Sequence, residues 1–333
     1  KLYMLQNNFW KKLNPAAFAL APMEDVTDTV FREVVMSTAA FDKLHLLFTE
    51  FTSVDGICHP LGRNAVLHRF KVNQSETTLL QKNQIKLIAQ IWGNDPEKFF
   101  KAAEFIAREC SFDGIDINMG CPVGKVIKQN TCSALIDQPN LALEIIDATI
   151  KGSGLPVSVK TRTGTHSHQT ERWIGQLLGS DVSAVTLHAR TQKMLSNYPA
   201  DWDQVSIAVK VKQRMNADIK ILGNGDVNSY NTGLKLIENS GADGVMIGRG
   251  IFTNPWFFSE DDSQRDVNEK ISLLEKHIRL FQETWNSSRN FSILKRFFKI
   301  YIHGFEGAAA LRASLMDSRS HEEALDAISR FSK

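Results

Sequence analysis

Short apolar or β-branched runs recur along the first three quarters of the chain, and each run ends at Gly, Pro or a cluster of polar residues. Runs of this length bounded by turn residues are typical of buried strands. Eight of them predict strands, over Ala17–Ala21, Leu44–Phe48, Leu87–Ile91, Gly114–Asn118, Pro156–Lys160, Ala184–His188, Ile219–Gly223 and Gly244–Gly248.

Amphipathic stretches lie between these runs and predict helices. In the clearest of them, Pro96–Arg108, apolar residues recur at the spacing of a core-facing helical stripe. Four more stretches have a similar pattern: Leu141–Ile150, Thr170–Leu178, Trp202–Gln213 and Ser229–Glu238.

Strands that are apolar almost throughout and alternate with helices are typical of parallel sheets covered on both faces. Eight such units in succession favour an α/β fold of the (β/α)8 type, a TIM barrel. A doubly wound sheet is the alternative, and it predicts Gly-x-Gly-x-x-Gly after the first strand. The chain has Ala21-Pro22-Met23-Glu24-Asp25 at that place, which argues against the alternative.

The pattern changes after Phe258. Residues 259–265 contain no apolar side chain and predict a linker. From residue 266 onward, apolar residues recur at helical spacing without any strand pattern. We therefore expect a TIM-barrel domain over residues 1–258 and a small C-terminal helical domain over residues 266–333.

Composition narrows the function classes. A hydrophobic share of 43% and a charged share of 23% exclude disorder, collagen and coiled coil as descriptions of the whole chain. The 39 basic and 37 acidic residues leave a net charge of +2, which excludes a uniformly basic nucleic-acid protein but allows a local basic patch. No apolar run is long enough to span a membrane. The four cysteines lack metal-ligand spacing. We expect a cytoplasmic monomer without a metal.

Glycine-rich sequences follow the last two predicted strands, at Gly223-Asn224-Gly225-Asp226 and at Gly248-Arg249-Gly250. In a TIM barrel the active site forms at the C-terminal ends of the strands, and the loops after strands seven and eight often bind phosphate. Glycine allows backbone N–H groups to approach an anion closely. Two ordinary turns are the alternative, but their place favours a phosphate site.

Three reactive side chains lie at other strand ends. Lys160 is predicted to point into the barrel mouth, where a buried ammonium needs a partner: an anionic ring, a Schiff-base carbonyl or a structural carboxylate. His188 alone is typical of a satisfied core histidine, but Lys160 and the phosphate site favour a functional role. Cys121, between Gly120 and Pro122, is predicted to place its sulfur at the mouth.

These residues resemble the tRNA-dihydrouridine synthases, a family of flavin enzymes. The resemblance runs in family order over residues 19–256, and Gly304–Arg312 resembles the helical tail. Its most specific elements are Asn118-Met119-Gly120-Cys121-Pro122 and His188-Ala189-Arg190-Thr191. The other matching stretches are Ala21-Pro22-Met23, Val159-Lys160-Thr161-Arg162, Ala200-Asp201-Trp202, Gly223-Asn224-Gly225-Asp226-Val227 and Gly248-Arg249-Gly250. Asn130-Thr131-Cys132-Ser133 departs from the family, which usually has a glycine-containing turn there.

The resemblance implies an oxidoreductase that reduces the C5=C6 bond of specific uridines in tRNA by hydride transfer from FMNH2, with NADPH as electron donor. Cys121 would donate the proton to C5, because a thiol of ordinary pKa is mostly protonated at pH 7. Asn118 would orient the base, and Arg190 would contact the substrate or its phosphate. The implied FMN contacts are Ala21, Pro22, Met23, Gln90, Lys160, His188, Asn224, Gly225, Asp226, Gly248 and Arg249.

A uridine must leave its stack before an enzyme can act on its ring, so the helical domain is expected to grip the RNA backbone. Lys295, Arg296 and Lys299 are the candidates, against the alternative of a solvated helix. Two other functions are considered: an FMN-dependent dihydroorotate or dihydropyrimidine dehydrogenase acting on a free pyrimidine, and a non-catalytic RNA-binding barrel. The helical domain argues against the first. Cys121, Lys160 and His188 together argue against the second.

Overall fold

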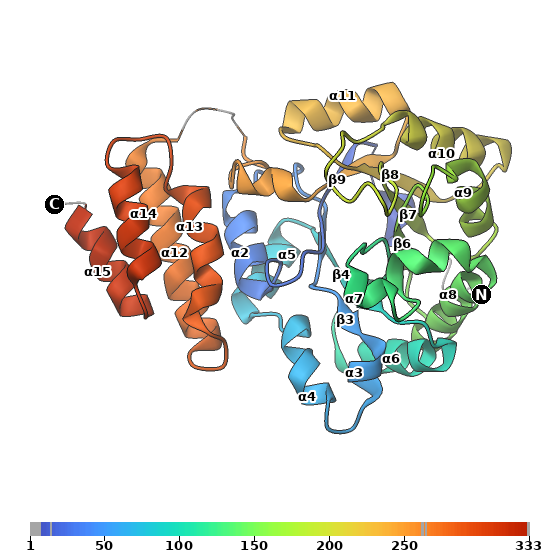
Figure 1. The fold of residues 1–333 in the computed structure, drawn as a ribbon, viewed down its shortest axis with the longest axis horizontal. Coiled ribbons are helices and arrows are strands. Elements are labelled where there is room, and N and C mark those ends of the chain that lie inside the picture. Colours follow the sequence, from blue (N-terminus) through green and yellow to red (C-terminus); the bar gives the residue numbers. More distant parts are fainter. Residues whose placement is uncertain (1–7, 14, 261–262, 264, 332–333) are drawn as a thin grey trace.

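The computed structural model describes residues 8–13, 15–260, 263 and 265–331, and it contains a closed parallel barrel followed by a helical segment (Figure 1). β1 pairs with both β2 and β9, and β2 pairs with β4, so the sheet closes. The predicted TIM barrel and its eight strands are confirmed. The strands are β1 (Ala17–Leu20), β2 (Leu46–Phe48), β3 (Thr52–Ser53), β4 (Lys86–Trp92), β5 (Gly114–Met119), β6 (Val157–Arg162), β7 (Ala184–His188), β8 (Lys220–Asn224) and β9 (Gly244–Ile247).

The two-residue strand β3 was not predicted, because so short a segment carries no periodicity. It pairs with the end of β4, through Thr52 opposite Ile91 and Ser53 opposite Trp92. It thereby extends the barrel wall beyond β2 at the end where the strands finish.

The five predicted barrel helices are confirmed within a few residues: α6 (Pro96–Glu109), α8 (Pro139–Ser153), α9 (Thr170–Leu178), α10 (Asp203–Arg214) and α11 (Tyr230–Ser240). Asp95 caps α6 by accepting from two backbone N–H groups, as an N-cap carboxylate does. The remaining elements of the barrel region are α2 (Thr29–Thr38), α3 (Val54–Cys58), α4 (Arg63–Val66), α5 (Gln74–Lys82), α7 (Gly124–Ile127), and the 3-10 helices η1 (Phe9–Lys12), η2 (Leu67–Phe70), η3 (Cys132–Asp137) and η4 (Arg249–Phe252).

The inside of the barrel is filled by a small apolar cluster that includes Trp10 of η1. Asn8 donates to Ser183 Oγ at 3.0 Å, just before β7 begins, so η1 covers the N-terminal ends of the strands. Trp10 is 1% exposed there. The opposite ends of the strands, where TIM barrels carry their sites, stay free for side chains that bind and react.

The helical segment contains α12 (Val267–Trp285), η5 (Phe291–Leu294), α13 (Lys295–Tyr301), α14 (Ala308–Asp317) and α15 (His321–Phe331). Its first helix starts at a capping box formed by Asp266 and Glu269. Figure 1 shows the segment beside α2. Residues 261, 262 and 264 of the predicted linker lie outside the described residues, and the division into two domains stays a prediction.

Contacts between α2 and the helical segment are both aromatic and ionic. The rings of Phe31 and Phe297 stack with their centroids 5.0 Å apart. The Trp285 indole N–H donates to Asp28 Oδ2 at 2.8 Å. Arg289 Nη1 lies 3.0 Å from the Asp28 carboxylate and 3.5 Å from that of Glu50, in surroundings where all three side chains are at most 8% exposed.

We expect Arg289→Ala to lower the free energy of unfolding by roughly 3 kcal/mol, because removing one partner leaves buried carboxylates uncompensated. Urea unfolding measures the loss. Arg108→Ala is the matched control: its side chain is 72% exposed and its ion pair with Glu104 spans 3.7 Å, so a change below about 0.5 kcal/mol is expected. Equal losses in the two variants would contradict a stabilising role for the Arg289 cluster.

Candidate active site

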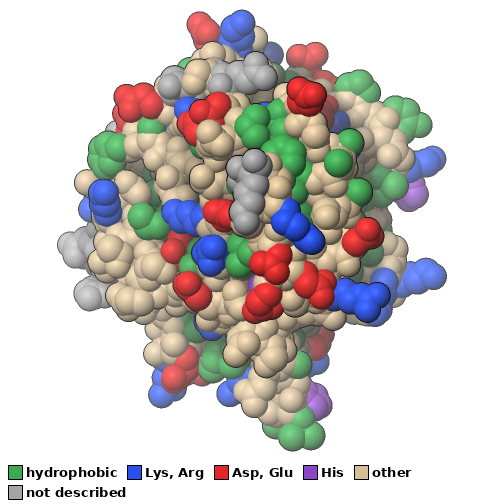
Figure 2. Space-filling view, turned by 90° about the vertical axis from the view of Figure 1, so that its left-hand side faces the viewer, with side chains coloured by type: hydrophobic (Ala, Val, Ile, Leu, Met, Phe, Trp, Pro, Cys, Tyr) green, Lys and Arg blue, Asp and Glu red, His purple; other side chains and the backbone are tan. Residues whose placement is uncertain are grey.

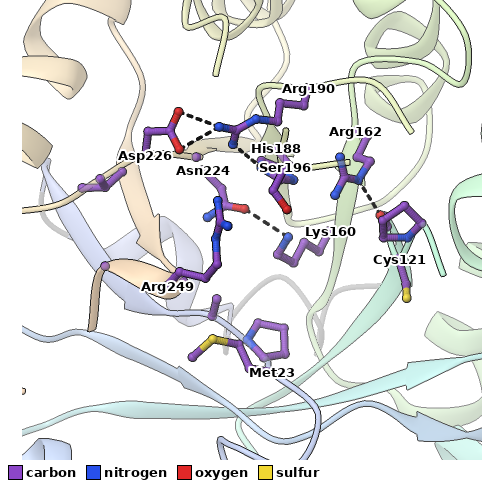
Figure 3. A pocket seen from close by; sticks show the side chains of 18 of the residues that line it. Met23, Cys121, Lys160, Arg162, His188, Arg190, Ser196, Asn224, Asp226 and Arg249 are labelled. Atoms are coloured by element: carbon purple, nitrogen blue, oxygen red, sulfur yellow. Dashed lines mark hydrogen bonds and ion pairs between the residues drawn. The ribbon is translucent and has the colours of Figure 1, made fainter. Parts of the chain in front are cut away.

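A pocket of about 400 Å³ opens at the C-terminal ends of the strands, within the size range of small-molecule sites (Figure 3). The barrel brings together in its lining all the residues that were predicted to bind a cofactor, together with Cys121, Asn118 and Arg190. Several lining residues were not predicted: Phe51, Arg162, Ser196, Asn228 and Thr253. Arg162 could have been predicted from the sequence, because it lies two residues beyond Lys160 and therefore on the same face of the same strand. Ser196 lies in a loop without any pattern.

Lys160 has a neutral partner. Its ammonium donates to Asn224 Oδ1 at 3.2 Å, and the Asn224 amide donates in turn to the Met246 carbonyl at 2.8 Å. The observed partner is therefore an amide and not the structural carboxylate that was one alternative. Burial, followed by the charge of Arg162, lowers the pKa of Lys160 to about 8. An anion entering the pocket would restore the charge balance around this ammonium.

His188 is held in its neutral form. Burial and the surrounding cations, Lys160 first among them, depress its pKa far below the usual range. Arg190 Nη1 lies 3.1 Å from His188 Nε2, and because a guanidinium can only donate, that nitrogen accepts. The ring's proton is therefore on Nδ1. The cations that contribute to this shift, Lys160, Arg162, Arg190 and Arg249, form a cluster of positive charge that suits an anionic ligand.

Arg190 was predicted to contact the substrate or its phosphate, and the structure gives its guanidinium three internal partners instead. It donates to Asp226 Oδ1 and Oδ2 at 2.7 and 2.6 Å, to the Tyr198 carbonyl at 2.6 Å, and to His188. The ion pair with Arg190 also lowers the pKa of Asp226. Only 2% of Arg190 is exposed. This geometry fits a residue that orients His188, and the predicted substrate contact of Arg190 stays a prediction.

Two glycines beside the ends of β8 and β9 occupy backbone positions that exclude larger residues. Gly225 has a φ of +124°, a conformation that L side chains rarely adopt. A Cβ on Gly250 would stand 2.1 Å from the Val227 carbonyl oxygen, which no side chain tolerates. Arg249 lies next to Gly250, and Figure 3 places it on the side of the pocket opposite Cys121. The polar lining thus has one end with Arg249 and the glycine-rich strand ends and another end with the Cys121 thiol.

A buried chain of polar side chains runs across β6, β5 and β4 and ends at Asn118, which bonds to the backbone of the turn that carries Cys121. Ser158 Oγ donates to Asp116 Oδ1 at 2.6 Å, and Gln90 Nε2 donates to Asp116 Oδ2 at 2.6 Å. Gln90 Oε1 accepts from the Asn118 amide at 3.1 Å. Burial raises the pKa of Asp116 to about 6. This chain was not predicted, because its members are far apart in sequence and become neighbours only through strand pairing.

The role of Asn118 in orienting the substrate base stays a prediction, and in the structure its carbonyl oxygen shapes the turn that follows β5. Oδ1 accepts from the Gly120 and Cys121 N–H groups at 3.1 and 3.0 Å. Arg162 Nε donates to the Gly120 carbonyl at 2.7 Å and fixes the same turn from β6. Cys121 is therefore held by its backbone from two strands.

Cys121 is more acidic than an ordinary thiol. A hydrogen bond from the Cys132 thiol, aided by the Val123 N–H and by Arg162 and Lys160, lowers its pKa to about 7 despite burial. An ordinary thiol pKa would leave Cys121 mostly protonated at pH 7, as was expected from the sequence. The lowered pKa reduces that protonated fraction, which corrects the expectation. The segment Asn130–Ser133, which differs from the glycine-containing turn usual in the family, forms a turn in which Asn130 and Cys132 have φ values of 56° and 54°. Ser133 Oγ donates to the Cys121 carbonyl at 2.7 Å.

We expect the rate of Cys121 alkylation by iodoacetamide to reach half its maximum near pH 7, because only the thiolate reacts. Cys132→Ala removes the first-named cause of the lowered pKa, so the half-maximal pH should move upward. Peptide mapping by mass spectrometry after timed alkylation measures both values for Cys121 alone. An identical pH profile in the two proteins would contradict the assigned cause.

The three basic residues predicted on the C-terminal helix do not face one direction. Arg296 and Lys299 line a second pocket, of about 850 Å³, where the helical segment meets the barrel. The Lys295 ammonium donates to the Met316 carbonyl instead. Thr253 lines both pockets and so lies between them. Figure 2 shows basic and acidic side chains mixed on the face presented by the helical segment, without a uniformly basic surface.

Among the helices that the structure describes, none combines the length and the apolar character that a membrane crossing requires. Within the described ranges, no three His, Cys, Asp or Glu side chains gather in a way that could hold a metal ion.

Solved structures share the barrel with this chain at low sequence identity. A histamine dehydrogenase from Rhizobium superposes with a TM-score of 0.54 at 10% identity, over 79% of this chain and 48% of that one. Morphinone reductase superposes with a TM-score of 0.50 at 12% identity, over 75% and 87%. At such identities the likeness shows the fold alone.

Sequence comparison is more specific. The probable tRNA-dihydrouridine synthase of Staphylococcus aureus is 40% identical over 329 residues, covering 98% of this chain and 96% of that protein. The probable tRNA-dihydrouridine synthase 2 of Bacillus subtilis is 40% identical over 321 residues, covering 96% and 95%. The family model described as dihydrouridine synthase matches residues 19–333. With the barrel and the pocket in place, these matches show that the chain belongs to the dihydrouridine synthase family.

Proposed function

We propose that this protein is a tRNA-dihydrouridine synthase that uses FMN. The observation that carries the proposal is the pocket at the barrel mouth, which joins an anion-accepting end to a thiol in a member of this family. The names of its relatives in Staphylococcus aureus and Bacillus subtilis support tRNA as the substrate. An oxidoreductase acting on a uracil ring needs a hydride source and a proton donor, and the two ends of the pocket suit these two roles.

The residues present fit FMN. A half-buried lysine that bonds to an amide among the described residues, the cations around His188 and two glycine-rich strand ends suit an anionic ring with a phosphate. Lys160 and His188 would contact the ring, and Asn224, Gly225, Gly248 and Arg249 would hold the chain and the phosphate. The flavin, when bound and reduced, supplies the hydride. NADPH is the proposed source of its electrons.

Cys121 is the proposed proton donor to C5 of the uracil. Its turn is fixed by Asn118 and Arg162, so the sulfur is held at one place at the pocket edge. A pKa near the working pH suits a general acid, because both its protonated form and its conjugate base are then accessible. Asp226 and Arg190 position His188, and we propose these roles in place of direct ribityl and substrate contacts.

The helical segment is the proposed tRNA-binding part, over residues 266–333, with the barrel of residues 1–258 as the catalytic domain. The pocket lined by Arg296 and Lys299 adjoins the catalytic pocket through Thr253, so a phosphate bound there would lie beside a uridine turned out of its stack. Contacts of this kind neutralise phosphates, and binding should weaken as salt concentration rises.

The test uses the purified full chain with FMN and NADPH. We expect NADPH oxidation to accelerate with tRNA that lacks dihydrouridine, and we expect dihydrouridine to appear in that tRNA by nuclease digestion and mass spectrometry. Dihydrouridine-free tRNA that remains unchanged while orotate or uracil is turned over would overturn the proposal in favour of a free-pyrimidine dehydrogenase. Tight tRNA binding without flavin binding or turnover would instead identify a non-catalytic RNA-binding barrel.

A further inference from the structure

Cys132 occupies a backbone position that suits glycine. Its φ of +54° lies in the left-handed region, which strains a residue that has a side chain. Its side chain is fully buried, at 0% exposed, so the thiol gains nothing from solvent. Strain of this kind at the edge of a pocket points to a role for the side chain that glycine could not fill.

The position of Cys132 beside Cys121 indicates that role. Ser133, the next residue, donates to the Cys121 carbonyl through its hydroxyl at 2.7 Å and its N–H at 3.4 Å. These bonds hold the two backbone segments together, as a disulfide between neighbouring side chains requires. The Cys132 thiol is close enough to act on the Cys121 thiol, because it is the leading cause of the lowered pKa of Cys121.

The two thiols differ in access. Cys121 lines the pocket and is partly exposed, whereas Cys132 is sealed behind it. Lys160 and Arg162 favour the thiolate of Cys121 through their charges. An accessible thiolate backed by a second thiol is the arrangement found at reversible redox sites.

We propose that Cys121 and Cys132 are a modification site, at which hydrogen peroxide converts the two thiols into a reversible disulfide. The Cys121 thiolate attacks one peroxide oxygen, the O–O bond breaks, and the hydroxide released takes up a proton to become water. The Cys132 sulfur then attacks the Cys121 sulfur, the S–O bond breaks, and the second oxygen leaves as water with the Cys132 proton. Two electrons pass from the thiols to the peroxide.

The disulfide makes the Cys121 thiol unable to react in the pocket and protects it from further oxidation. Without a second thiol, further peroxide would carry a sulfenic acid to the sulfinic acid, which thiol reductants do not reverse. With Cys132 in place, the sulfenic acid is consumed first, and a dithiol reductant restores both residues.

The test treats the reduced full-chain protein, carrying Cys110→Ser, with a small molar excess of hydrogen peroxide. Cys110 is replaced because no Lys or Arg separates it from Cys121, whereas Lys125 and Lys128 place Cys121 and Cys132 on separate tryptic peptides. We expect a linked peptide pair, lighter than the sum of its parts by two hydrogens, that disappears after dithiothreitol. Cys132→Gly, which suits the backbone, and Cys132→Ala should instead gain two oxygens irreversibly at Cys121.

Sulfinic acid at Cys121 without a linked pair, forming as fast in the parent as in both Cys132 variants, would overturn the proposal. The readout is a peptide mass and needs neither tRNA nor turnover. Failure of the disulfide is therefore distinguishable from failure of the proposed function.

Discussion

Replacing Cys121 with alanine is expected to slow reduction of tRNA by about 10²- to 10⁴-fold, the contribution typical of a positioned general acid. The flavin should stay bound, because Cys121 lies at the opposite side of the pocket from Arg249. Single-turnover reoxidation of the reduced enzyme by dihydrouridine-free tRNA, followed by visible absorbance, measures the chemical step directly.

Cys110→Ala is the matched control for this variant. Cys110 lies at the end of α6, outside the pocket lining, so its replacement should leave the single-turnover rate within about twofold of the parent. The pH dependence gives a second check. Because the pKa of Cys121 is lowered to about 7, its protonated fraction and the rate should fall as pH rises above that value. A Cys121→Ala rate equal to that of the parent would remove the general-acid assignment.

Replacing Lys160 with methionine is expected to weaken FMN binding by about 10- to 100-fold, because a hydrogen bond to a charged group contributes roughly 1.5–3 kcal/mol. Methionine has nearly the same length and removes a partly buried charge, so the fold should not be destabilised. Titration of the flavin-free protein with FMN, followed by flavin fluorescence, gives the dissociation constant.

Lys151→Met tests whether loss of any lysine has this effect. Lys151 lies on α8, its side chain is 66% exposed, and its partner is Asp147 on the same helix, so its variant should bind FMN like the parent. Unchanged affinity in Lys160→Met would show that the Lys160 ammonium does not contact the flavin. An equal loss of FMN affinity in both variants would show that affinity depends on the overall charge of the protein and not on a specific contact of Lys160.

Whether a site residue could be predicted depends on its place in its strand. Cys121, Lys160 and His188 could be placed at the barrel mouth in advance, because each ends or follows an apolar run and parallel strands finish at one edge. Asp116 and Ser158 lie inside such runs. There the alternation of side chains between the two faces of a strand predicts only that they point inward. Their hydrogen bonds to Gln90 exist because β4, β5 and β6 align these residues side by side.

The helical segment shows the same limit. Spacing was sufficient to predict helices after residue 266, yet it could not tell that Lys295 turns to Met316 while Arg296 and Lys299 face the barrel. Direction depends on how the helix packs, and that depends on distant partners such as Phe31 and Asp28. The Arg289 cluster was missed for the same reason.

By itself the sequence determined the barrel, its eight strands, the helical tail and the residues that gather at the mouth, because hydrophobic periodicity and the direction of parallel strands are local properties. Only the tertiary structure decided what each polar group does there. It joined Arg190 to Asp226, gave Lys160 an amide partner and set Cys132 against Cys121. Charge, hydrogen bonding and pKa depend on neighbours in space, and those neighbours are residues far apart along the chain.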